Sequence, residues 1–96
     1  MIKTWRNSVS RRIFEEGRAP KRFGSLDLTL AQRRLQAVSD VKALIERRVI
    51  ASFRLHKLRG SRKGQWSVSL NGPWRICFYF DEEAGDAFGV EVTDYH

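Results

Sequence analysis

The spacing of hydrophobic residues changes near the middle of the chain, from a period of three or four to a period of two. From about Asp27 to Val49, the first period predicts one amphipathic helix. Its apolar positions are Leu28, Ala31, Leu35, Val38, Ile45 and Val49, and its outer side carries Arg33, Arg34, Arg47 and Arg48. A shorter helix is predicted between Ser8, a candidate N-cap, and Gly17, a typical helix stop. Its apolar residues are Val9, Ile13 and Phe14.

The second half alternates hydrophobic and polar residues, as strands with one buried face do. Its apolar members are Phe53 and Leu55, then Trp66, Val68 and Leu70, then Trp74, Ile76, Phe78 and Phe80, and lastly Phe88, Val90 and Val92. The turn Asn71-Gly72-Pro73 and an acidic stretch from Asp81 to Asp86 separate the later strands. The pattern predicts an antiparallel meander covered on one face by the helices, and hence the α+β class.

Two segments near the N-terminus follow these periods less clearly. Ile2 to Trp5 alternate like a short edge strand, and residues 17–26 form a basic, irregular loop on sequence. We expect this loop to be the least ordered segment. Only Phe23 and Leu26 can bury large apolar side chains, and this burial does little to offset the conformational entropy lost when the loop becomes ordered. No repeat or linker divides the 96 residues, so we expect a single domain, 1–96.

Composition excludes several classes of protein. No stretch approaches the roughly 18 consecutive apolar residues of a membrane span, and the first residues lack a signal peptide's apolar centre. The single cysteine, Cys77, excludes an internal disulfide framework and fits a reducing compartment. We therefore expect a cytoplasmic protein without a membrane partner.

Charge is distributed unevenly along the chain. The formal net charge is +7, and residues 1–63 carry 17 of the 18 lysines and arginines against 5 acids. Residues 64–96 carry one cation, Arg75, against 6 acids. A basic surface of this kind is typical of nucleic-acid binding, although a merely solubilising surface explains it as well.

Side-chain parity predicts where reactive residues gather. If Trp74 and Ile76 face the helices, Arg75 projects from the opposite face, and the same argument places His56 there. The chain ends Asp94-Tyr95-His96, directly after the last predicted strand. A meander lets these residues converge on the uncovered face, beside a loop whose four cations are Lys57, Arg59, Arg62 and Lys63.

Metal-free cleavage of RNA needs such side chains. The 2′-hydroxyl attacks the neighbouring phosphorus while a base removes its proton and an acid protonates the leaving 5′-oxygen. Histidine does either near neutral pH, with a typical gain of about 10²–10⁴-fold. A rigid guanidinium such as that of Arg75 meets the charge of the phosphorane, and the loop cations hold flanking phosphates. We expect no cofactor.

The same residues also have structural explanations. His56 is then an ordinary exposed strand residue, and Arg75 pairs with Glu91 or with the acids at 81–86. The terminal histidine is then an unstructured end. A metal site is a weaker alternative because it lacks helical histidine spacing and a cysteine ligand; its residues would be His56, Asp94 and His96. Composition and spacing alone support a basic α+β domain that binds RNA or DNA.

Four blocks of the sequence resemble the HigB-type killer proteins, a branch of the RelE-like toxins of bacterial toxin–antitoxin pairs. In order they are residues 54–60 (RLHKLRG), 64–69 (GQWSVS), 71–78 (NGPWRICF) and 94–96 (DYH). Their order and spacing match, and the similarity covers essentially the whole chain. The resemblance implies a RelE-like fold, in which two N-terminal helices pack on an antiparallel sheet.

The resemblance also implies cleavage of messenger RNA in the A site of the ribosomal 30S subunit, without a metal, and inhibition of translation. The implied active-site residues are His56, Arg75, Asp94, Tyr95 and His96, and the implied RNA contacts are Asn71 and Arg59 or Lys57. In this arrangement the two histidines share the proton transfers. Asp94 orients or assists them, and Tyr95 stacks on a base.

The partner implied by the resemblance is a helix-turn-helix antitoxin of the HigA type, through which alone the toxin would bind operator DNA. A non-catalytic basic RNA- or DNA-binding module is the alternative function. The antitoxin of such a pair is disfavoured, because no helix-turn-helix is legible in the sequence.

Overall fold

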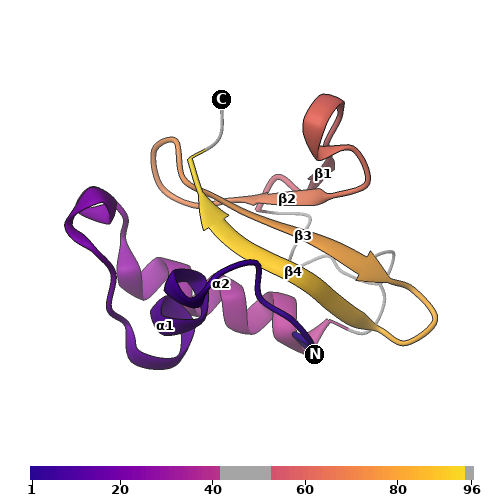
Figure 1. The fold of residues 1–96 in the computed structure, drawn as a ribbon, viewed down its shortest axis with the longest axis horizontal. Helices are drawn as coiled ribbons and strands as arrows, with labels where there is room; N and C mark the ends of the chain where they lie inside the picture. The colour runs from indigo at the N-terminus through magenta and orange to yellow at the C-terminus, as the bar shows by residue number, and fades with distance from the viewer. Residues whose placement is uncertain (42–52, 95–96) are drawn as a thin grey trace.

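Residues 1–41 and 53–94 are described by the computed structural model, which places two helices against one four-stranded sheet. The elements are α1 (Ser8–Glu16), η1 (Lys21–Phe23), α2 (Leu28–Asp40), β1 (His56–Lys57), η3 (Gly60–Arg62), β2 (Trp66–Ser69), β3 (Arg75–Asp81) and β4 (Asp86–Thr93). The strands pair antiparallel in the order β1-β2-β3-β4. Both helices lie on one side of this sheet (Figure 1). The α+β prediction is confirmed.

The N-cap of α1 is Asn7, and the prediction of Ser8 was wrong by one residue. The Asn7 side chain accepts a hydrogen bond from Ser10 N at 2.9 Å, which satisfies a helix-terminal donor. The Ser10 hydroxyl is fully buried and accepts from Val92 N at 2.9 Å, which ties α1 to β4. Gly17 ends the helix with φ 65°, as predicted.

Helix α2 is shorter than the predicted one. It begins after Asp27, whose side chain accepts from Leu30 N at 3.0 Å. It ends at Asp40, because Val41 is extended, with φ −74° and ψ 130°. The prediction of one continuous helix through Val41 was therefore wrong. The predicted positions beyond it lie outside the described residues; they are Ile45, Arg47, Arg48 and Val49.

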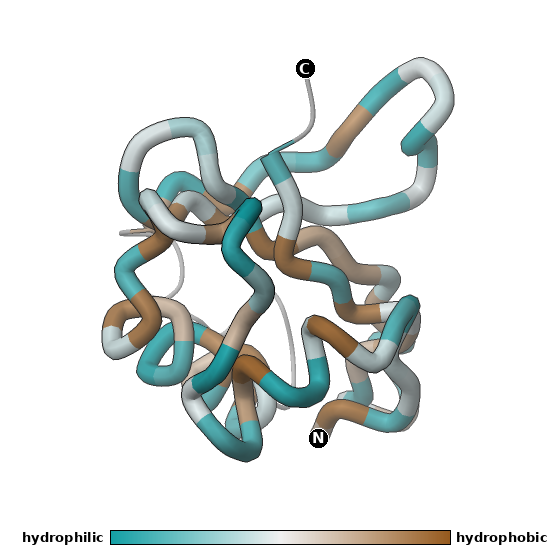
Figure 2. The backbone as a smooth tube through the Cα atoms, turned by 60° about the vertical axis from the view of Figure 1, so that its left-hand side comes forward, coloured by the Kyte–Doolittle hydropathy of each residue, from teal (hydrophilic) through white to brown (hydrophobic). Residues whose placement is uncertain are grey.

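The core fills the space between the helices and one face of the sheet. Val68, Ile76 and Val92 align across three strands and are fully or almost fully buried. Figure 2 shows hydrophobic residues interleaved with hydrophilic ones along the chain, as two-faced elements require. Loop 17–26 also contributes, because it contains η1 and buries Phe23 and Leu26. It is less irregular than predicted, and its mobility in solution stays a prediction.

Strand β4 departs from the predicted alternation at Phe88. A register shift between Cys77 and Tyr79 leaves Phe88 opposite Tyr79, while Ala87 pairs with Phe80 and is fully buried. A bulge reverses the phase of the side chains that follow it. The prediction that Phe88 faces the core was therefore wrong, and Ala87 takes that place.

The N-terminal segment covers the outer edge of β4. Ile2 bridges Ala87 and Trp5 bridges Val90, both in parallel, so the predicted edge strand is present only as isolated bridges. Lys3 N donates to the Ala87 carbonyl at 2.8 Å, which satisfies part of an otherwise open edge. Within residues 1–41 and 53–94, no helix has the length and apolarity needed to cross a membrane.

Candidate active site

The sheet register places the predicted site residues in two neighbouring rows on the face away from the helices. From β1 to β4, one row is His56, Ser67, Cys77 and Glu91, and the next contains Ser69, Arg75 and Thr93. With strands about 4.8 Å apart and a rise of about 3.3 Å per residue, the Cα atoms of His56 and Arg75 are on the order of 12 Å apart. The two residues share a face, as parity predicted, without direct contact.

Part of this face is covered, contrary to the expectation of an open surface. Arg62 reaches from η3 across the sheet to β4, where its Nη1 lies 3.0 Å from Glu91 Oε1. Arg6 Nε holds the same carboxylate oxygen at 3.4 Å. Between β1 and β4, Ser67 and Cys77 are fully buried beneath this contact. Arg62 therefore fixes the loop, and its charge is balanced by Glu91.

Burial makes Cys77 unreactive. Removal from solvent raises the pKa of its thiol from the ordinary 9.0 to about 11, while nearby Arg62 lowers it and Glu91 raises it by smaller amounts. The thiolate is the reactive form of cysteine. A thiol that stays protonated under a loop is not a nucleophile for the reaction.

Arg75 is held by the carbonyl groups of its own turn. Its Nη1 donates to the Trp74 carbonyl at 2.8 Å and to the Gly72 carbonyl at 3.1 Å. A guanidinium has five donors, so this arrangement leaves the rest of the fork for an anion. In the described part of the chain, Arg75 forms no ion pair. The structural alternative of pairing with Glu91 therefore has no support there.

His56 is exposed on β1, at the edge of the sheet. Its Nδ1 lies 3.0 Å from the Arg54 carbonyl oxygen. A carbonyl oxygen only accepts, so Nδ1 carries the hydrogen, and Nε2 of the neutral ring has the free lone pair. This tautomer suits a general base.

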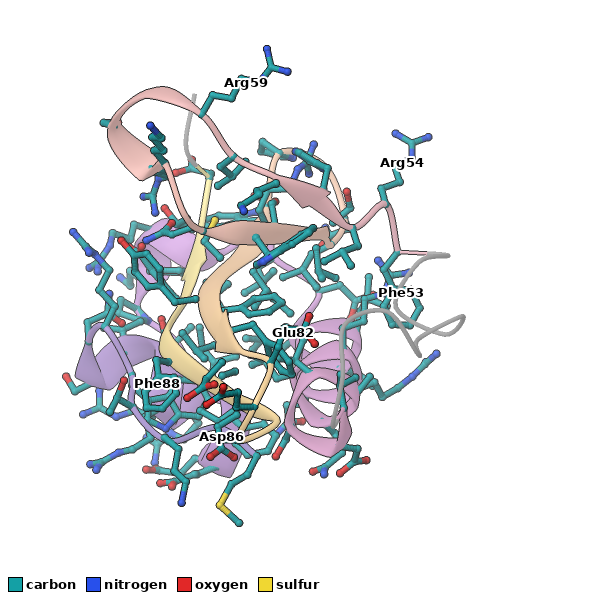
Figure 3. The ribbon with its side chains drawn as sticks, turned by 90° about the vertical axis from the view of Figure 1, so that its right-hand side faces the viewer. Phe53, Arg54, Arg59, Glu82, Asp86 and Phe88 are labelled. Atoms are coloured by element: carbon teal, nitrogen blue, oxygen red, sulfur yellow. The ribbon has the colours of Figure 1, made fainter. Side chains whose placement is uncertain are left out.

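Three of the four predicted loop cations are exposed to solvent: Lys57, Arg59 and Lys63. Lys57 Nζ lies 5.6 Å from the centre of the Trp66 ring, and Arg59 projects away from the body of the molecule (Figure 3). Lys57 pairs with Trp66, whose row continues to the buried Phe78, so Lys57 lies on the opposite face of the sheet from His56, contrary to the prediction. The RNA contacts of all three cations stay a prediction. Arg62 differs from them because it is held by Glu91.

Asp94 follows β4 directly and is exposed. Its neighbour Thr93 pairs with Arg75, so Asp94 leaves the sheet close to the guanidinium-bearing strand. It lines a cavity of about 300 Å³ together with Arg22 and Trp74. The two residues that complete the predicted site, Tyr95 and His96, lie outside the described residues.

Asn71 has a structural role that the sequence did not indicate. Its Oδ1 accepts from Asp27 N at 2.8 Å, and its Nδ2 donates to the Ser25 carbonyl at 2.8 Å. The amide thus ties the turn between β2 and β3 to the start of α2. Its contact with RNA stays a prediction, and both ends of the amide are already hydrogen-bonded.

Two further arginines beside Arg75 were missed. A cavity of about 210 Å³ is lined by Arg34, Phe53, Arg54, Ser69, Leu70, Gly72 and Arg75. For Arg54 the alternation of residues 53–56 predicted a strand, but β1 begins only at His56 and Arg54 lies in a turn with φ 60°, so parity does not explain its place at the cavity. Arg34 was predicted on the outer side of the helix, but it is half-buried and donates to the carbonyl of Ser69, 35 positions away in the sequence.

Among the described residues, no three His, Cys, Asp or Glu side chains gather as metal ligands do. The metal site considered from the sequence includes His96, which lies outside them.

Comparison with known proteins places the chain in one family. Residues 3–96 match the family described as "RelE-like toxin of type II toxin-antitoxin system HigB". The chain is also 32% identical over 98 residues to "Endoribonuclease HigB" of Proteus vulgaris, and the match spans 100% of both chains. The four blocks that carried the resemblance all fall within the matched region. The chain therefore belongs to the HigB-like toxins, a family of RelE-like toxins of type II toxin–antitoxin systems.

Proposed function

We propose that this HigB-like toxin is a ribosome-dependent endoribonuclease that cleaves messenger RNA in the A site and thereby inhibits translation. The name of its full-length relative from Proteus vulgaris, an endoribonuclease, supports the assignment of the activity. The observation that carries the proposal is Arg75, a guanidinium fixed by two carbonyls on a rigid strand, one strand away from Thr93 and the start of the Asp94-Tyr95-His96 ending.

The proposed chemistry is metal-free acid–base catalysis. The RNA 2′-hydroxyl loses its proton to one histidine and attacks phosphorus, while the other histidine gives a proton to the departing 5′-oxygen. His56 and His96 share these two transfers. Asp94 orients the terminal imidazole, and Tyr95 stacks on a base. Arg75 donates paired hydrogen bonds to the phosphorane oxygens as their negative charge grows.

Docking on the ribosome uses the exposed cations around the site. Lys57, Arg59 and Lys63 attract ribosomal and messenger RNA through phosphate contacts whose strength falls as salt rises. Arg62 acts indirectly, since its pair with Glu91 holds the loop that carries Arg59 and Lys63. Asn71 takes part by fixing the turn before Arg75 and, in addition, by contacting RNA.

The family implies an antitoxin as the protein partner of this chain. We propose that this antitoxin is of the HigA type with a helix-turn-helix domain, and that the toxin reaches operator DNA only through it. The site of action is the cytoplasm, where the toxin meets translating ribosomes.

Brief induction in cells, followed by mapping of 5′ ends on transcripts, tests the proposal. We expect new ends confined to translated regions and in phase with the reading frame. His96→Gln should remove these ends. Ends spread equally over untranslated RNA would overturn ribosome dependence, and growth inhibition without any new ends would favour a non-catalytic RNA- or DNA-binding module.

A further inference from the structure

The cavity beside Arg75 is the most strongly basic one described in this molecule. Arg34 comes from α2, Arg54 from the segment before β1, and Arg75 from β3, and no acid is among the described residues that line it. At about 210 Å³, it is several times the roughly 30 Å³ that one water occupies in the liquid. There is room for one hydrated anionic group beside the arginines that line the cavity.

Arg34 is the fixed wall of this cavity. Its Nη1 donates to the Ser69 carbonyl at 2.6 Å, and its guanidinium carbon lies 4.4 Å from the centre of the Phe53 ring. These two contacts orient the plane of the guanidinium and leave its remaining donors for another group. A pre-oriented arginine of this kind suits the binding of phosphate.

Arg54 forms the rim. Its φ of 60° makes it the one non-glycine residue in the left-handed region among those described, and its side chain extends into solvent (Figure 3). Its carbonyl is held by the His56 ring. An exposed cation at the rim, together with a fixed one in the wall, provides two positive groups from different elements for one anion.

The position of the cavity indicates which phosphate it takes. Ser69, on the cavity side, and Thr93, which leads to Asp94, flank Arg75 on opposite strands. A phosphate in the cavity therefore lies on the far side of Arg75 from Asp94.

We propose that Arg34, Arg54 and Arg75 form a pocket for one backbone phosphate of the RNA, next to the scissile phosphate on the side away from Asp94. This inference rests on the proposed function for the identity of the anion. It adds Arg54 and Arg34 to the residues that position the RNA, and it predicts a defined path for the strand from the pocket across Arg75 towards the C-terminus.

Binding of a short 2′-O-methyl RNA to the full chain tests the pocket without any cleavage, because the attacking hydroxyl is blocked. We expect Arg54→Gln to weaken binding about tenfold, the usual effect of removing one charge-assisted hydrogen bond. The slope of log K against log salt should fall by about 0.7 to 1. The matched control is Arg33→Gln, an exposed arginine of α2 that does not line the pocket. Equal effects of the two variants, or no measurable binding by the wild type, would overturn the pocket.

A methylphosphonate scan then identifies the linkage. Neutralising the phosphate in the pocket should weaken binding by the wild type more than binding by Arg54→Gln, which keeps only Arg34 and Arg75 at that phosphate, whereas other linkages should affect both proteins alike. If the loss of affinity from the methylphosphonate and the loss from Arg54→Gln multiply at every linkage, no single phosphate interacts with Arg54, and the assignment is overturned. So would unchanged RNA binding with a weakened antitoxin complex, because the pocket would then hold a protein carboxylate. Cleavage of programmed ribosomes by the wild type is measured separately, and its failure would overturn the proposed function alone.

Discussion

Arg75 combines a fixed position with unused hydrogen-bonding capacity, so its removal should affect chemistry far more than folding. We expect Arg75→Ala to slow cleavage on ribosomes by at least about 10²-fold, the scale for removing one transition-state donor. Arg75→Lys should recover only part of the rate, because a point charge cannot replace the fork. Single-turnover cleavage and thermal melting measure the two effects. An alanine variant that melts much earlier but still cuts RNA would make Arg75 structural.

His96 is the sharpest test of the proposed chemistry, because its proposed role predicts a large loss of activity. We expect His96→Gln, and deletion of His96, to abolish cleavage and growth inhibition. A catalytic imidazole supplies about 10²–10⁴ in rate, so cleavage should fall far more than the melting temperature does. The substitution controls for the shift of the terminal carboxylate that deletion causes. Growth arrest by both variants at wild-type expression would refute this role.

Cys77 should make the protein lose stability in alkali. Burial raises the pKa of its thiol from 9.0 to about 11, so the unfolded chain releases this proton first. The stabilisation is complete below pH 9 and is lost as pH rises towards 11, and it amounts to on the order of 2 to 3 kcal/mol. Urea unfolding at pH 8 and pH 11, for the wild type and Cys77→Ala, isolates this effect from other titrating groups. Equal losses in both proteins would contradict it.

At the scale of elements, the loop around η3 should depend on the pair between Arg62 and Glu91. Arg62→Met removes the ion pair that spans the face from η3 to β4. We expect faster amide exchange at Leu58, which donates to the Gln65 carbonyl, and faster labelling of the Cys77 thiol. Lys63→Met, a neighbouring exposed cation, serves as the control for loss of charge. Unchanged labelling in Arg62→Met would show that other contacts hold the loop.

The elements themselves were largely predictable, because periodicity and turn residues are local signals. Gly17, Asp27 and the turn at 71–73 all lie where the pattern placed them. The phase of β4 was not predictable, since its bulge depends on pairing with β3 and alternation around Phe88 looks regular. The sequence also did not predict that the site face is partly covered. The ion pair that covers it, between Arg62 and Glu91, joins residues 29 positions apart.

The candidate site shows the same division. Parity correctly placed His56 and Arg75 on one face, since side-chain direction follows from the strand alone. Parity does not predict how far a side chain is exposed to solvent, so exposed Lys63 and half-buried Arg62 looked equivalent in the sequence. The position of Arg34 beside Arg75 depends on tertiary contacts with Ser69 and Phe53, which the sequence pattern does not predict.

At the scale of the whole molecule, some of the exposed cations lie far from the acidic residues that join β3 to β4. In Figure 3, Arg54 and Arg59 project far from Asp86, the first residue of β4. Such a separation orients the protein as it approaches a polyanion and raises the rate of productive encounters. The direction of the charge, and not only its amount, should therefore matter for ribosome binding.

Charge reversal on the loop tests this orientation. The double variant Arg59→Glu with Lys63→Glu should weaken ribosome association, and the slope of its salt dependence should fall by about 0.7 or more for each phosphate that the loop no longer binds. Its plateau rate of cleavage at saturating toxin should change much less, because the catalytic groups stay in place. Arg12→Glu with Arg33→Glu alters the net charge equally on exposed residues of α1 and α2, away from the loop. If both double variants weaken association to the same extent, net charge alone governs docking and the loop has no special place in it. If the wild type cuts naked RNA as fast as programmed messenger RNA, docking contributes nothing to the reaction.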